Sequence, residues 1–123
     1  MKKITTKTNE VSLDSNGIIH KKVIEGAHLD RQHIIESEKI CEELAGSKKF
    51  LLFIDAMSLH TMTPEAVDEL KKSHNTRVAT AIFSKSTAIR ILADHLGKEE
   101  KIPIKLFPDK EQALQWLLTF KKK

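Results

Sequence analysis

The polar side chains best placed to do chemistry follow a short apolar run, FLLFID, at residues 50–55. They are a carboxylate, an imidazole and three hydroxyls, carried by Asp55, Ser58, His60, Thr61 and Thr63. Beside the amino terminus of a helix expected from residue 64, such groups could bind an anion or a polar group of a partner. The purely structural alternative is that Asp55 accepts hydrogen bonds from its own loop and that Thr63 caps the helix.

A second polar group, made of Ser84, Lys85 and Ser86, follows the next apolar run at residues 78–83. Right-handed crossovers between parallel strands bring the carboxyl ends of those strands to one edge of the sheet. We therefore expect residues 55–64 and 84–87 to form one rim. Helix amino termini at such a rim favour an acidic or phosphorylated group, so the expected ligand is a protein partner that carries one.

Sequence motifs of the common enzyme classes are absent. The four glycines, at positions 17, 26, 46 and 97, are isolated, so there is no glycine-rich phosphate loop. No two of the six histidines stand three or four residues apart, no cysteine pair joins them, and there is no G-x-S-x-G turn for a catalytic serine. We expect no catalysis, no cofactor and no metal.

Composition narrows the class of protein further. With 40% hydrophobic and 31% charged residues, and no apolar stretch near the ~20 residues of a membrane helix, the sequence predicts a cytoplasmic protein without a membrane span. Its amino terminus turns polar where a secretory signal would be apolar. The net charge of +4 comes from scattered lysine pairs without aromatic platforms, which does not favour nucleic acid as a partner. The single cysteine, Cys41, is predicted to be a buried small hydrophobe without a redox role.

The pattern of apolar residues predicts the strands. Five consecutive apolar residues at 50–54 indicate a central strand covered on both faces. Further strands are expected at residues 78–83 and 104–107, and the segments 4–13 and 18–24, joined by the turn-forming residues 14–17, predict a β-hairpin. The second hairpin segment has apolar ends and a polar middle at His20, Lys21 and Lys22, which we expect to face solvent.

Capping residues predict four helices, which begin after Asp30, after Thr63, after Ser84 or Ser86, and after Asp109. On the first helix, Glu36, Glu38, Lys39, Glu42 and Glu43 should lie mostly on the side away from the core. The last helix should hold Trp116 in the core. The order ββαβαβαβα indicates one α/β domain, residues 1–123, with covering helices on a mixed β-sheet.

The chain is similar to a known family in several of these features. The strand ending in LFID, the helix start MTP at residues 62–64, and the closing pattern F-x-D-x-x-x-A-x-x-W-L at residues 107–117 resemble the STAS domains, in particular the small bacterial STAS/SEC14-like, SpoIIAA-like proteins. The resemblance covers nearly the whole chain. It implies a non-enzymatic regulatory or protein-interaction domain, and it leaves room for a homodimer.

The resemblance also carries an alternative and a departure. Anti-sigma factor antagonists with this fold are phosphorylated on a serine at the helix start after the central strand, but here that place falls on Pro64 and its preceding acid on Thr63, so the phosphoserine is missing. The alternative is a SEC14-like carrier or sensor of a small apolar or anionic ligand. Its expected apolar lining is Met57, Leu59, Met62, Ile89 and Leu92.

Overall fold

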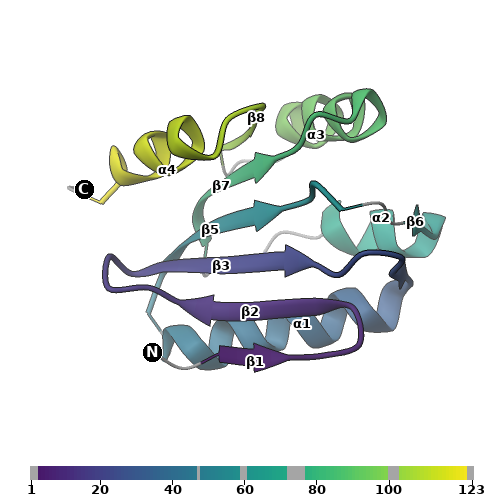
Figure 1. Ribbon diagram of the computed structural model, residues 1–123, viewed down its shortest axis with the longest axis horizontal. Helices are drawn as coiled ribbons and strands as arrows, with labels where there is room; N and C mark the ends of the chain where they lie inside the picture. The colour runs from purple at the N-terminus through teal and green to yellow at the C-terminus, as the bar shows by residue number, and fades with distance from the viewer. Residues whose placement is uncertain (1–2, 47, 59–60, 72–76, 100–102, 122–123) are drawn as a thin grey trace.

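The computed structural model describes residues 3–46, 48–58, 61–71, 77–99 and 103–121 (Figure 1). The strands are β1 Lys3–Thr5, β2 Asn9–Leu13, β3 Ile18–Val23, β4 His28–Leu29, β5 Phe50–Asp55, β6 Thr61–Met62, β7 Arg77–Phe83 and β8 Ile104–Phe107. The helices are α1 Arg31–Ala45, α2 Pro64–Lys71, α3 Thr87–Glu99 and α4 Lys110–Leu118.

Six of the strands form one mixed sheet, in the order β1-β2-β3-β5-β7-β8. The pairs β1–β2 and β2–β3 are antiparallel, and β3–β5, β5–β7 and β7–β8 are parallel. The predicted central strand is confirmed, because β5 lies between β3 and β7 and its residues Phe50 to Phe53 are buried. The mixed α/β architecture with four helices is therefore as the sequence predicted.

Helices lie on both faces of the sheet (Figure 1). Between α1 and the sheet, the core consists of Val11, Ile19, Cys41, Phe50 and Leu52. On the opposite face, α4 buries Ala113 and Leu117 against Leu51, Phe53, Ala79, Ala81 and Phe107. Trp116, predicted to lie in this core, is half-buried at its margin, where its ring is 5.6 Å from that of Phe107.

The amino-terminal segment differs from the prediction of one long strand. The segment 4–13 breaks at residues 6–8, because the Thr6 hydroxyl accepts hydrogen bonds from the N–H groups of Thr8 and Asn9. The hairpin itself is confirmed, and Asp14 organises its turn by accepting from the N–H of Asn16 at 2.8 Å and of Ile18 at 3.0 Å. Two strands that the sequence did not predict, β4 and β6, form a separate parallel pair.

The first helix begins and ends where the sequence predicted. The Asp30 side chain accepts a hydrogen bond from the N–H of His33, and the His33 ring accepts one from the N–H of Asp30. Gly46 ends the helix in the left-handed conformation, with φ of 63°. These contacts satisfy backbone groups that the helix itself leaves unpaired.

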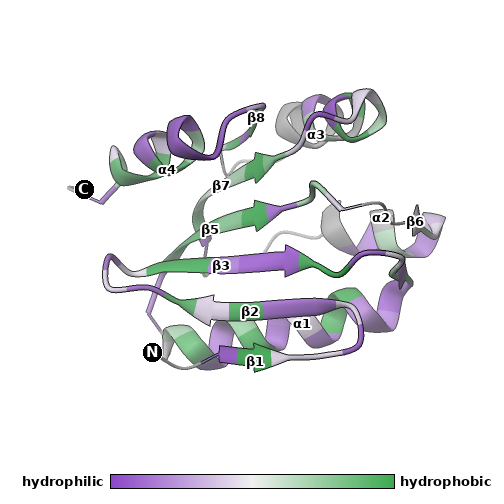
Figure 2. Cartoon of the chain, viewed as in Figure 1, coloured by the Kyte–Doolittle hydropathy of each residue, from purple (hydrophilic) through white to green (hydrophobic). Residues whose placement is uncertain are grey.

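Two charged residues were wrongly expected on the surface. Glu38 is 3% exposed and Lys21 is 3% exposed, although the sequence placed the first among solvated helix residues and the second in the polar middle of a strand. Figure 2 shows that one half of β3 is hydrophilic, and the strand's sequence assigns His20, Lys21 and Lys22 to that half. The Glu38 carboxylate pairs with Arg77 at the start of β7, and the Lys21 ammonium lies 3.6 Å from the same oxygen. The single Glu38 carboxylate attracts both cations, which offsets part of the cost of burying them, and the cluster keeps a net charge of +1.

The cysteine next to this cluster is fully buried, as predicted. Burial raises the pKa of the Cys41 thiol to about 11, and the nearby charges of Lys21, Glu38 and Arg77 partly offset one another. The thiol is therefore protonated at neutral pH, and protonated thiols are poor nucleophiles.

Replacing Glu38 by glutamine should lower the free energy of unfolding by about 3–5 kcal/mol, because two buried cations lose their only shared carboxylate among the described residues. Urea denaturation measures the loss. The matched control is Glu36→Gln on the exposed face of α1, which should change stability by less than about 0.5 kcal/mol. Equal midpoints for both variants would show that the cluster does not stabilise the fold.

Cys41 should react with a thiol reagent at least about a hundredfold more slowly in the native chain than in the unfolded chain at neutral pH, because a pKa of about 11 against 9.0 lowers the thiolate fraction by that factor. The Cys41 thiol has a higher pKa in the folded chain than in the unfolded chain. Its protonated form therefore contributes fully to the free energy of unfolding below pH 9, and that contribution is lost as the pH rises toward 11. A native reaction rate equal to the rate in denaturant would contradict the prediction.

Candidate functional site

The turn after β5 uses its first polar residue for its own structure. The Asp55 carboxylate accepts a hydrogen bond from the N–H of Met57 at 3.1 Å. The N–H of Ala56, between these two residues, donates to the Phe83 carbonyl at the end of β7 at 2.9 Å. The carboxyl ends of β5 and β7 therefore lie side by side, as expected for parallel neighbours. The structural interpretation of Asp55 agrees with this geometry.

The other candidate residues of this turn contact different parts of the chain. The Thr63 hydroxyl caps α2 by accepting from the N–H of Ala66 at 3.1 Å. The Thr61 hydroxyl lies 2.5 Å from Nδ1 of His28, across the β4–β6 pair. Ser58 is half-buried, and His60 lies outside the described residues. The structure thus does not gather the described members of this set, Thr61, Thr63 and Ser58, into one cluster.

The polar residues after β7 are closer together. The Ser84 hydroxyl is buried and accepts from the N–H of Ser86 at 3.1 Å, and the Ser86 hydroxyl accepts from the N–H of Ile89 at 3.3 Å. Ser86 is therefore the N-cap of α3. Ser84 N–H donates to the Phe107 carbonyl at 3.1 Å, which joins this turn to the end of β8. Lys85, between the two serines, is exposed.

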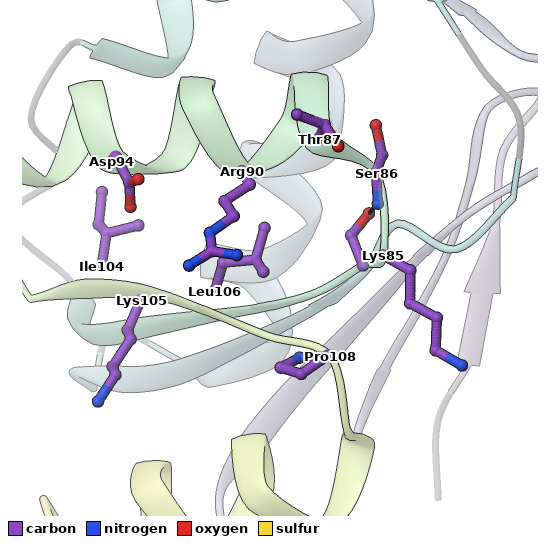
Figure 3. Close-up of a pocket in the computed structure, with 10 residues that line it drawn as sticks. Lys85, Ser86, Thr87, Arg90, Asp94, Ile104, Lys105, Leu106 and Pro108 are labelled. Carbon is purple, nitrogen blue, oxygen red and sulfur yellow. Dashed lines mark hydrogen bonds between the residues drawn. The ribbon is translucent and has the colours of Figure 1, made fainter.

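These residues close one end of a groove of about 470 Å³ between α3 and β8 (Figure 3). It is lined by Ser84, Lys85, Ser86, Thr87, Arg90, Asp94, Ile104, Lys105, Leu106 and Pro108. The predicted Ser84, Lys85 and Ser86 are thus brought together with residues of α3 and β8.

Charged side chains of α3 extend over the strand in this groove. Figure 3 shows Arg90 above Leu106 and Asp94 above Ile104, while Lys105 points away from the helix. The ammonium of Lys105 instead lies 5.4 Å from the centre of the Phe107 ring on the α4 side. The side chains of Arg90 and Asp94 have neither a hydrogen bond nor an ion pair within the part of the chain that the structure describes. The groove is therefore positive toward the start of α3 and negative one helical turn further on.

Asp55 lies in a different place from this groove. It lines a depression of about 170 Å³ on the face of the sheet that carries α4, together with Lys3, Glu10, Ser12, His20, Lys21, Lys22, Phe53 and Lys110. Side chains alternate between the two faces along a strand, which separates Asp55 from residues on the α3 side. The expected single rim is thus divided between two surfaces.

Sequence reasoning missed Arg90, Asp94 and the strand residues Ile104 and Leu106. A signal was present, because Thr87, Arg90 and Asp94 recur at the helical period and Ile104 and Leu106 alternate with Lys105. The pattern becomes informative only when the topology places α3 against β8.

Similarity to other proteins agrees with this fold. Residues 11–121 match the family described as a domain of unknown function, DUF7793. The chain belongs to the DUF7793 family. No curated protein is significantly similar to it.

The fold of this DUF7793 chain is similar to that of a solved structure. The crystal structure of an uncharacterized DUF3478 protein with a SpoIIAA-like fold, from Shewanella loihica PV-4, superimposes with a TM-score of 0.67. The match covers 93% of this chain and 98% of the other, at 20% identity. The SpoIIAA-like fold expected from the sequence is confirmed, and at this identity the likeness concerns the fold alone.

Two further features of the described residues bear on function. None of their helices is both long and apolar enough to cross a membrane. Nor do three or more of their His, Cys, Asp or Glu side chains come together as a metal site would require.

Replacing Thr63 by alanine should cost about 1 kcal/mol of unfolding free energy, because α2 loses the hydroxyl that accepts from Ala66. The control is Thr63→Ser, which keeps that hydroxyl and should keep most of the stability. Thermal or urea unfolding separates the two variants. An alanine variant as stable as the parent would show that the hydroxyl is free for another role.

Proposed function

We propose that this domain is a non-enzymatic binding module and that the groove between α3 and β8 is its contact site for a protein partner. The supporting observation is that Arg90 and the amino terminus of α3 lie in the same open groove, while the hydroxyls of Ser84 and Ser86 are already engaged in backbone hydrogen bonds. Such hydroxyls are poorly placed to act as nucleophiles.

The charge of the groove favours an acidic group in the partner. Arg90 lies within the groove, Lys85 stands at its end, and the first N–H groups of α3 add partial positive charge. Arginine binds carboxylate and phosphate oxygens in a two-pronged geometry that lysine does not offer. An acidic or phosphorylated side chain is therefore the group that we expect next to Arg90.

The described residues of the apolar-carrier alternative do not form one lining. Met62 packs with the cluster around Leu29 and Ile34, whereas Ile89 packs with Ile82 and Ala93. Met57 is 42% exposed, Leu59 lies outside the described residues, and the side chain of Leu92 is not among those described. A small anion held by Arg90 is the form of this alternative that fits the groove.

The proposal is testable by cross-linking from inside the groove. Because Cys41 is buried with a raised pKa, a Thr87→Cys variant can be labelled selectively with a photo-reactive group, with Lys49→Cys, exposed before β5, as the matched control. Proteins of the source cell should cross-link from position 87 and not from position 49. Adding Arg90→Glu should reduce those products by about tenfold or more.

Equal products from both positions, or products that Arg90→Glu leaves unchanged, would contradict the proposed site. Saturable binding of inorganic phosphate at Arg90 without any protein cross-link would instead support the small-anion alternative. Turnover of a substrate that Arg90→Glu abolishes would contradict the non-enzymatic part of the proposal.

A further inference from the structure

The groove between α3 and β8 has main-chain hydrogen-bonding groups along one wall. In the six-stranded sheet β8 is the last strand, so only one of its edges faces β7. The N–H of Thr80 donates to the Pro103 carbonyl at 2.9 Å, and the N–H of Ser84 donates to the Phe107 carbonyl at 3.1 Å. In a parallel ladder every second residue bonds to the same neighbour, so Lys105 also faces β7.

The intervening residues, Ile104 and Leu106, therefore direct their N–H and C=O groups outward. Neither residue has a hydrogen bond outside the β7–β8 ladder among the described residues. Unpaired groups of this kind can pair with an extended chain, which adds a strand to the sheet. Their side chains point toward α3, so the free edge and the groove belong to one surface (Figure 3).

Prolines limit the length of this free edge. Pro103 precedes β8 and Pro108 follows it, and proline provides no N–H for pairing. An added strand would thus pair over about four residues, or about 13 Å. That length suits a short peptide segment and opposes open-ended stacking of sheets.

From these observations we propose that β8 accepts an extended segment of a protein partner as an additional strand, lying in the groove beneath α3. The inference rests on the proposed function, because it states how the partner occupies the same groove. Main-chain hydrogen bonds from Ile104 and Leu106 would hold the segment, and the α3 side chains would select its sequence.

The spacing of the groove charges specifies that sequence. Arg90 and Asp94 are four residues apart on α3, which separates them by about 6 Å along the helix axis. Side chains on one face of a strand recur about every 6.6–6.8 Å. The segment should therefore carry an acidic residue near Arg90 and a basic residue two positions away near Asp94, with both side chains facing the helix.

Another surface residue suits the same segment. Ile91 is 65% exposed and follows Arg90 on α3, within one arc of the helix that also contains Thr87 and Asp94. An apolar residue of the segment that covers Ile91 would remove apolar surface from water, which favours binding. A second copy of this chain is less suitable than such a segment, because each copy carries a net charge of +4 and like charges repel.

The experiment uses two synthetic peptides, acetyl-Thr-Glu-Val-Lys-Val-Thr-amide and acetyl-Thr-Lys-Val-Glu-Val-Thr-amide, which present the charges in both directions along the strand. Titration of the isotope-labelled chain, followed by amide NMR, should shift the N–H signals of Ile104 and Leu106 with about millimolar affinity or better for at least one peptide. Arg90→Glu should weaken that binding by about tenfold.

N-methylated versions of the better peptide test strand pairing directly. Methyl groups on one set of alternate residues should weaken binding by about tenfold or more, and methyl groups on the other set should have little effect, because only alternate N–H groups face β8. Each set is the matched control of the other. Side-chain recognition alone would give no such alternation.

The outcomes separate the two proposals. If binding depends on Arg90 but both sets of N-methyl groups have the same effect, strand addition is overturned and the proposed contact site is retained. No shift at Ile104 and Leu106 up to about 10 mM of either peptide also overturns strand addition, and the cross-links from position 87 then decide the proposed function. Concentration-dependent shifts at these residues without peptide, with a dimer in sedimentation, would identify a second copy as the occupant and contradict the proposal.

Discussion

The buried carboxylate of Glu38 is the contact on which the arrangement of the sheet depends. It binds Arg77 of β7 and lies 3.6 Å from Lys21 of β3, so one helix residue links the two strands on either side of β5. A shift of β3 by one residue would turn Lys21 to the other face and leave the carboxylate with one cation. The charged cluster therefore favours a single register, which apolar neighbours alone specify less strictly.

A fixed register determines where the carboxyl ends of β5, β7 and β8 lie. Hydrogen bonds from Ala56 to Phe83 and from Ser84 to Phe107 keep these ends level, so the turns that follow begin at a common edge. The hydroxyls in two of these turns then cap helices, as Thr63 does for α2 and Ser86 for α3. Because those hydroxyls are engaged, the recognition that we propose at this edge would depend on the charged residues of α3 and on the main chain of β8.

Local signals in the sequence were sufficient for much of this structure. The apolar run of β5 and the caps at Asp30, Thr63 and Asp109 act over a few residues and lie where the sequence placed them, and Ser86 is one of the two caps that the sequence offered for α3. Burial of Glu38 and Lys21 was not predictable in this way, because the cluster brings together Lys21 of β3, Glu38 of α1 and Arg77 of β7, which are distant in sequence. The groove was missed for a similar reason: Arg90 and Ile104 become neighbours only after α3 crosses back over the sheet.

The division of the predicted rim has a physical cause in the pleat of the sheet. Asp55 ends β5 on the face of the sheet that carries α4. The side chains of Ile104 and Leu106 in β8 lie on the other face, next to α3. A site at the end of parallel strands can draw on either face, and here helix α3 supplies Arg90 and Asp94 on one of them, two charges without an ion pair among the described residues. A groove that combines an unpaired strand edge with charges one helical turn apart can distinguish extended segments by both backbone and sequence. This combination favours recognition of a polypeptide over capture of an apolar molecule, which would need a lining of uncharged side chains.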